Sequence, residues 1–190
     1  MVIKINKFKS SILFGILFIC YSCDDNYKVR TYKLSKNDKQ SLAVSSNVSV
    51  NKDGQYLKWE KPFSWEPSEG SSMRLASFLV PYSKGSGDLS VIELSGNGGG
   101  ILSNVNRWRR QLSLEPTDMK SIENKIEKFV GTIGEFQVIK IIDVNKESSF
   151  ICAILPAGSK TIFIKLAIRY DGISEVEEDF IKFCTSINFN

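Results

Sequence analysis

The stretch from Gly96 to Leu112, GNGGGILSNVNRWRRQL, organises the rest of the chain. Three consecutive glycines at 98–100 do not suit a strand interior, because glycine loses the most backbone entropy on ordering and offers no side chain to pack. They suit a tight turn with positive φ. The residues that follow have helical periodicity and place a set of apolar side chains on one face. That face holds Ile101, Val105, Trp108 and Leu112. The stretch therefore predicts a strand-to-helix turn followed by an amphipathic helix.

The polar side of this predicted helix is the candidate contact surface. Asn106, Arg107 and Arg110 fall opposite the apolar face, with Asn104 on one flank. The glycine turn adds free N–H groups at a helix start, where the helix dipole attracts anions. The candidate binding residues are Gly98, Gly99, Gly100, Asn104, Asn106, Arg107 and Arg110, with Trp59 and Trp65 at the rim.

Two simpler interpretations of these residues remain open. The arginines could only solvate the surface, while Asn104 and Gln111 bind loop backbone instead of a ligand. A P-loop would need Gly-Lys-Ser/Thr at the helix start, and the chain has Gly100-Ile101-Leu102. Trp59 and Trp65 could cover the core instead of forming an aromatic ledge.

The composition is that of an ordinary globular domain. The 190 residues are 42% hydrophobic and 24% charged, which suits one domain with an N-terminal extension. Three of the 25 Lys and Arg residues and no acid lie in residues 1–22, so the remainder holds 22 basic against 21 acidic residues. This balance excludes an electrostatic nucleic-acid binder.

The chain contains no histidine. Ser-His-Asp and Cys-His catalysis and histidine-based zinc sites are therefore excluded. The sequence has no CxxC pair and no acidic calcium loop. We expect a protein without metal or cofactor that is not an enzyme, although chemistry by a carboxylate pair is not excluded by composition.

Residues 1–22 have the features of an export signal. Lys4, Lys7 and Lys9 precede an apolar run at 12–19, which is shorter than the roughly 20 residues that a permanent membrane span needs. Cys23 follows the small residue Ser22 and precedes a polar segment, which resembles the signal of bacterial lipoproteins. That resemblance implies acylation of Cys23, including palmitate, and a lipid anchor in the cell envelope, at the periplasmic or surface face of the outer membrane.

Two alternatives to Cys23 stay open. Cys20 has Leu17 at the appropriate distance but follows Ile19, and a plain secretory signal would leave no lipid. If the cysteine is lipidated, it carries three acyl chains, which is more than the two membrane-binding signals that stable anchoring requires. The membrane is thus one expected partner. The second is a protein or a small anionic ligand.

The remaining chain divides at residue 56. Residues 23–55 are polar and predict a tether, with a short strand at 28–34. Residues 56–190 predict the globular domain. Its expected strands are 73–80, 89–94, 135–143, 149–155 and 161–170, with a hairpin loop at 83–88. Its expected helices are 101–112, a short helix capped by Thr117, and a terminal helix from Ser174.

This order of elements predicts an α+β fold. Strands come in two runs with helices between and after them, which favours a central antiparallel sheet of about six strands covered by helices. Cys152 falls in a strand and Cys184 on the apolar face of the terminal helix. They are either two separate buried thiols or a disulfide, which would need Cα atoms within about 7 Å.

Several motifs resemble a family of uncharacterised exported bacterial lipoproteins. They are the run NVNRWRRQL at 104–112, the pair Gly99-Gly100, Arg74-Leu75-Ala76-Ser77-Phe78, and Trp59-x-x-Pro62-x-x-Trp65. The resemblance implies an exported domain of the PsbP/Mog1 type, with an antiparallel sheet between helices. It implies no established activity.

The sequence leaves three hypotheses for the function of the protein. The first is a lipid-anchored envelope protein that binds or scaffolds a partner without catalysis. The second is an assembly factor for a membrane complex, and the third is an envelope enzyme that acts on a small anionic substrate.

Overall fold

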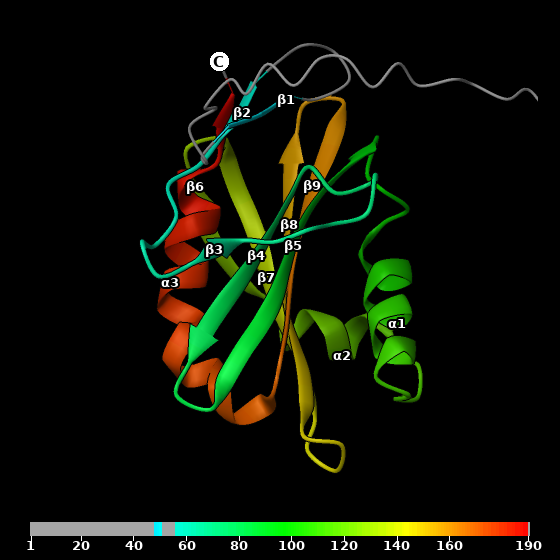
Figure 1. The fold of residues 1–190 in the computed structure, drawn as a ribbon. Coiled ribbons are helices and arrows are strands. Elements are labelled where there is room, and N and C mark those ends of the chain that lie inside the picture. The colour runs from blue at the N-terminus through cyan, green and yellow to red at the C-terminus, as the bar shows by residue number, and fades with distance from the viewer. Residues whose placement is uncertain (1–47, 51–55, 190) are drawn as a thin grey trace, which may run out of the picture. The chain divides into compact units, whose positions relative to one another are not determined.

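The computed structural model describes residues 48–50 and 56–189. Its main feature is a seven-stranded antiparallel sheet with the strand order β3-β4-β5-β9-β8-β7-β6 (Figure 1). The strands are β3 (Glu66–Pro67), β4 (Ala76–Tyr82), β5 (Gly85–Ser95), β6 (Glu127–Gly131), β7 (Gly134–Asp143), β8 (Ser148–Ala157) and β9 (Lys160–Ile168). The helices are α1 (Ile101–Gln111), α2 (Met119–Glu123) and α3 (Ile173–Ser186), with a short 3-10 turn η1 (Tyr170–Gly172) before α3. The predicted α+β class is confirmed.

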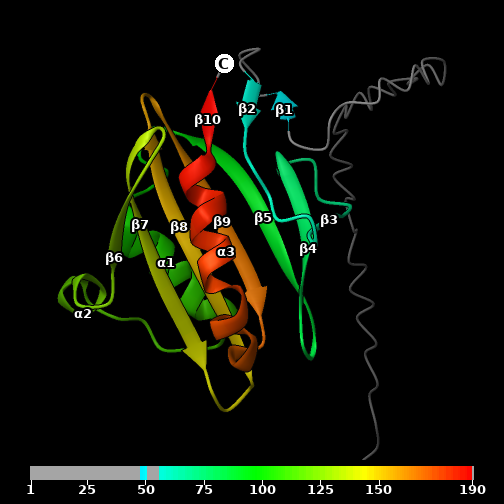
Figure 2. The same cartoon turned by 90° about the vertical axis from the view of Figure 1, so that its left-hand side faces the viewer.

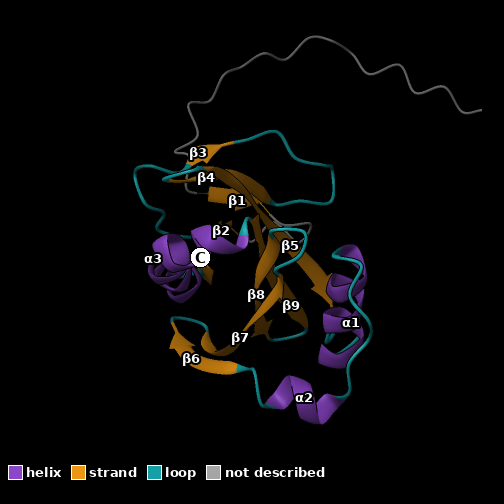
Figure 3. Cartoon of the chain, turned by 90° about the horizontal axis from the view of Figure 1, so that it is seen from below, coloured by secondary structure: helices purple, strands orange, loops and turns teal. Residues whose placement is uncertain are grey.

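Helices cover both faces of the sheet. Helix α3 lies on one face, and α1 and α2 lie on the other (Figures 2 and 3). Because side chains alternate along a strand, each strand supplies both layers. In β9, Ile162, Ile164 and Leu166 join the core beneath α3. Phe163 joins the core beneath α1, with Ala167 packed against it.

Two-residue turns join β4 to β5, β6 to β7 and β8 to β9. The predicted loop at 83–88 is therefore wrong in extent, because the turn is only Ser83-Lys84 and β5 begins at Gly85. A Cβ at Gly87 would lie 2.7 Å from Leu166 Cδ1 and 2.9 Å from the Ala167 carbonyl oxygen. Glycine here permits a close approach within the sheet and does not mark a loop.

The core beneath α3 is built on an aromatic cluster. Phe183 of α3 is fully buried, and its ring centroid lies 5.2 Å from that of Trp65 and 6.1 Å from that of Trp59. Phe78 of β4 meets the Phe183 ring edge-on at 5.9 Å. Trp59 and Trp65 therefore cover this core, which confirms that interpretation. Their predicted place at the rim of the contact surface is wrong.

The core beneath α1 confirms the predicted helix face. Val105, Trp108 and Leu112 are buried there, and the Trp108 ring meets Phe163 of β9 edge-on at 6.2 Å. Cys152 is buried in this same core, whereas Cys184 is buried in the core beneath α3. The two thiols are free and lie on opposite faces of the sheet, as two separate buried groups. Burial raises the pKa of both thiols, which keeps them protonated.

A second, three-stranded sheet has the order β1-β2-β10, with β1 at Val48–Val50, β2 at Tyr56–Lys58 and β10 at Asn188–Phe189. The backbone N–H of Glu60 donates to Ser186 Oγ at 2.8 Å, which ties the end of α3 to the chain after β2. Strand β1 falls within the segment predicted as a tether. The predicted signal, Cys23 and the predicted strand at 28–34 lie outside the described residues.

Membrane-spanning helices were sought in the part of the chain that the structure describes. None of its helices combines the length and hydropathy needed to cross a bilayer.

Candidate functional site

The turn before α1 depends on glycine. The φ angle is 59° at Gly98, 91° at Gly99 and 77° at Gly100, which confirms the predicted positive values. At Gly98, a Cβ would lie 2.4 Å from the Phe163 ring. Asn97 Oδ1 accepts a hydrogen bond of 3.0 Å from the Gly99 N–H and tightens the turn. The start of α1 is thereby fixed against the sheet.

Asn104 holds this turn from inside. Its side-chain amide donates to the carbonyl oxygens of Gly98 at 2.9 Å and Gly100 at 2.7 Å, and the residue is only 3% exposed. Its Oδ1 accepts a 2.7 Å hydrogen bond from the Arg107 guanidinium. The predicted binding role of Asn104 thus becomes an indirect one, because it orients Arg107 and has little surface of its own.

Asn106 acts similarly on the chain after α1. Its amide accepts from the Thr117 N–H at 2.8 Å and donates to the Thr117 carbonyl at 2.9 Å. With Thr117 held in this way, the cap of α2 is Asp118, whose Oδ1 accepts from the Ser121 N–H at 2.9 Å. The prediction that Thr117 caps this helix is therefore wrong by one residue.

Arg107 and Arg110 are exposed on α1, as predicted. Within the described residues neither forms an ion pair, and the sequence of α1 contains no acid. Arg109 is half-buried, and its Nε donates to the Glu115 carbonyl oxygen at 2.6 Å. The helix therefore presents three guanidinium groups that form no ion pair in the part of the chain that the structure describes.

A cavity of about 140 Å³ opens beside Arg107, between α1 and the sheet. Its apolar part includes Phe163, Trp108 and Leu94, and its polar part consists of Arg107, Gln111 and Lys165. Met73, which also lines it, is 68% exposed. The lining combines aromatic side chains with two cations and an amide, which suits a ligand that carries an anionic group on an apolar body.

Lys165 is the most informative residue of this cavity. Its Nζ donates to Gln111 Oε1 at 2.9 Å and lies 4.4 Å from the centre of the Phe150 ring. It forms no ion pair in the described part of the chain. Burial is the largest cause and lowers the pKa of Lys165; the next largest effect, from Cys152, raises it, and the charges of Arg74 and Arg107 lower it. A half-buried ammonium without an acid partner would be stabilised by a bound anion.

The structure brings together only part of the predicted site. Arg107, Arg110 and the glycine turn lie on the α1 side of the sheet, whereas Trp59 and Trp65 lie in the core on the other side. Lys165 was missed. The sequence could have indicated it, because this lysine falls between Phe163 and Ala167 on the half-covered side of a buried strand.

Comparison with known proteins gives structural likeness alone. No protein-family model matches the chain, and no curated protein matches it. A protein from Bacteroides thetaiotaomicron is similar over 70% of this chain, with 12% identity and a TM-score of 0.43, and the match covers 45% of that protein. This chain therefore corresponds to less than half of it.

Two further solved structures match most of their own length. Cyanobacterial PsbP (CyanoP) from Synechocystis is 14% identical over 77% of this chain and 94% of that protein, with a TM-score of 0.48. LpqN, described as involved in cell envelope biogenesis of Mycobacterium tuberculosis, is 9% identical over 72% of this chain and 84% of its own, with a TM-score of 0.38. The resemblance to exported lipoproteins through the NVNRWRRQL run stays a prediction.

Proposed function

We propose that this protein is a non-catalytic, lipid-anchored module of the bacterial cell envelope that binds an anionic group of a partner protein through Arg107, Arg110 and Lys165. The single observation that supports the binding surface is Lys165, a half-buried cation that lacks an acid partner among the described residues and lines the same cavity as Arg107. A partner carboxylate would balance both charges, and an apolar neighbour would fill the space over Phe163.

The way in which Arg107 is held also supports the proposal. Asn104 accepts from the guanidinium and is itself fixed by two hydrogen bonds to the glycine turn. An arginine that is oriented in advance loses less side-chain entropy when it binds a carboxylate. An arginine that served only for solubility would need no such support.

The anchor is proposed from the sequence, with Cys23 as the acylated residue. Mass spectrometry of the native protein from membranes should find an N-terminus at Cys23 that carries acyl mass. A native chain that begins at Met1 and stays in the cytosolic fraction would contradict this part of the proposal.

The binding surface is tested by crosslinking in intact cells followed by affinity capture and mass spectrometry. The variant Arg107→Ala/Arg110→Ala should lower the yield of the crosslinked partner about tenfold or more, because it removes the charges that face the partner. Its melting temperature should stay close to that of the wild type, since both side chains are exposed.

A matched control removes the same charge elsewhere. Lys128 and Lys182 are exposed on β6 and α3, away from α1, and their replacement by Ala lowers the net charge by the same amount. The control should capture the partner as the wild type does. Equal loss in both variants would show that only net charge matters, and unchanged capture by the α1 variant would refute the proposed surface.

A further inference from the structure

The outer edge of β7 is covered along only half of its length. Strand β6 pairs with β7 from Gly134 to Val138, where Val138 faces Glu127. The chain before Glu127 turns away, because the N–H groups of Lys125 and Ile126 bond back to the Ile122 carbonyl. No strand pairs with this edge of β7 from Ile139 to Asp143 within the described residues.

The register identifies which backbone groups this edge presents. Gly131 and Gly134 close a two-residue hairpin and form a hydrogen-bonded pair, and such pairs alternate along an antiparallel ladder. The alternation directs the N–H and C=O groups of Lys140 and Ile142 outwards. The opposite edge of the sheet follows the same rule, since β3 pairs with β4 at Leu79 and the next outward position is Pro81.

The two edges of the sheet differ in protection. On β4, Pro81 has no N–H to offer to another strand, a common way to block an edge. On β7, neither Lys140 nor Ile142 is a proline, and the Lys140 ammonium is occupied by Glu177 at 2.6 Å and Glu127 at 2.9 Å. Ile142 is 43% exposed. The β7 edge is therefore open to pairing.

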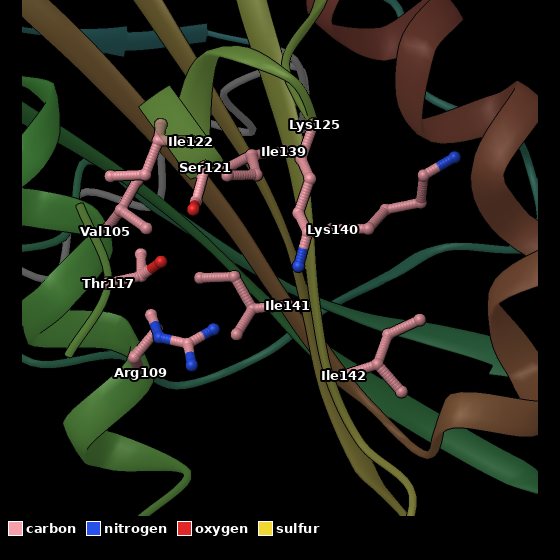
Figure 4. A pocket seen from close by; sticks show the side chains of 10 residues that line it. All are labelled: Val105, Arg109, Thr117, Ser121, Ile122, Lys125, Ile139, Lys140, Ile141 and Ile142. Atoms are coloured by element: carbon pink, nitrogen blue, oxygen red, sulfur yellow. The ribbon is translucent and has the colours of Figure 1, made fainter. Parts of the chain in front are cut away.

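A cavity of about 250 Å³ lies directly beside this open edge, between β7, α1 and α2 (Figure 4). Its apolar lining consists of Val105, Ile122, Ile139, Ile141 and Ile142. Its polar lining consists of Arg109, Lys125, Thr117, Ser121 and the ion-paired Lys140. A strand added to β7 would place every second one of its side chains on this side of the sheet.

The charges of the cavity specify the partner. Arg109 and Lys125 form no ion pair within the described residues, and Figure 4 shows both head groups directed towards Ile141. Of the acids near this edge, Glu127 already pairs with Lys140, and Asp118 accepts from Ser121. The space beside β7 is thus positive and unbalanced, and it would favour an acidic side chain over a basic one.

We propose that the edge of β7 from Ile139 to Asp143 binds an extended, acidic segment of a partner protein as an additional strand. The backbone of the segment would bond to Lys140 and Ile142. An acidic side chain would lie between Arg109 and Lys125, and an apolar one would enter the cavity. Strand addition takes affinity from main-chain hydrogen bonds and specificity from alternate side chains. The proposal is independent of the surface around Arg107.

The test uses the intact chain as bait for a random decapeptide library displayed on phage. Enriched peptides should contain acidic residues next to apolar ones. Synthetic copies, measured by fluorescence anisotropy, should bind Arg109→Ala/Lys125→Ala about tenfold or more weakly than the wild type. The matched variant Arg107→Ala/Arg110→Ala should bind within about twofold, which separates this site from the proposed function.

Two measurements report the strand itself. Amide hydrogen exchange of the wild type should slow at Lys140 and Ile142 when the peptide binds. Two further copies of the peptide would carry N-methyl groups, one on the odd-numbered amides and the other on the even-numbered amides. Only the copy whose methylated amides face β7 should lose binding, and this result does not depend on whether the protein variants fold. The proposal is overturned by a library without enrichment, by peptides that bind equally without acids, by protection elsewhere, or by a dimer of this chain that protects the same edge.

Discussion

The helices that cover the two faces of the central sheet differ in how their charges are paired. On the α3 side, cations meet carboxylates: Lys140 pairs with Glu177 and Glu127, and Lys182 pairs with Glu178 at 2.7 Å. On the α1 side, Arg74 pairs with Asp88 at 2.9 Å, but six other cations form no ion pair within the described residues. These cations are Arg107, Arg109, Arg110, Lys120, Lys125 and Lys165.

The faces also differ in packing. In the core beneath α3 two tryptophan rings both contact Phe78 and Phe183, whereas cavities of about 140 and 250 Å³ open beside α1. Tight packing and balanced charge stabilise the folded chain by itself. Open space with unbalanced charge stabilises it less and leaves binding capacity. The α3 face therefore contributes more to stability, and the proposed binding surface lies on the α1 face.

The largest expected effect is on the α3 face. Phe183→Ala removes a fully buried ring that contacts Trp59, Trp65 and Phe78, and should lower the free energy of unfolding by about 3–5 kcal/mol. Urea denaturation followed by tryptophan fluorescence measures this change.

The control for this prediction is Leu102→Ala on α1, where the side chain is 42% exposed. It should lower the free energy of unfolding by less than about 1 kcal/mol. Similar losses in the two variants would remove the contrast in packing between the faces.

An intermediate effect is expected at the turn that fixes α1. Gly98→Ala would combine a positive φ with a Cβ 2.4 Å from the Phe163 ring, and should cost about 2–4 kcal/mol. Gly99→Ala has a similar φ but no atom within 4 Å of the added Cβ, and should cost only about 1–2 kcal/mol. Thermal melts of the two variants measure the difference. Equal melting temperatures would mean that contact with Phe163 does not fix the turn.

The smallest expected effect is at Lys165. Because its pKa is lowered in the folded protein, the ammonium destabilises the fold at neutral pH, and wild-type stability should rise as the pH climbs through that lowered pKa towards 10.5. Because Lys165 is partly exposed, solvent screening limits this effect, so Lys165→Met should be more stable by less than about 1 kcal/mol at pH 7, with the advantage shrinking towards about pH 10. Urea melts at the two pH values test this. A destabilised variant at pH 7 would show that Lys165 is satisfied within the fold.

Much of the fold was predictable from apolar periodicity. The long strands β7, β8 and β9 and the helices α1 and α3 carry repeated buried positions, so their patterns predicted them within a few residues. Strand β6 was missed because it has five residues and its two large apolar side chains point to different sides. Phe129 stacks on Phe136 at 5.6 Å, and Val130 is 77% exposed.

The candidate site was predictable only in part, because pairing of charges depends on distant residues. The arginines of α1 are adjacent in sequence and could be found together. Lys165 reaches them from β9, and its relation to Gln111 requires the helix to lie across that strand. The sequence also could not show that Asn104 and Asn106 bind backbone, since an amide on a helix has the same pattern in either role.

The pairing of β2 with β10 has a consequence for biosynthesis. Residues 57 and 58 pair with 48 and 49 on one side and with 188 and 189 on the other, so the α3-side core is completed only after a segment far along the chain has been made. Until then Trp59 and Trp65 lack the ring of Phe183. An interrupted chain would expose these indoles to chaperones and proteases, so that incomplete copies are recognised and removed before they accumulate.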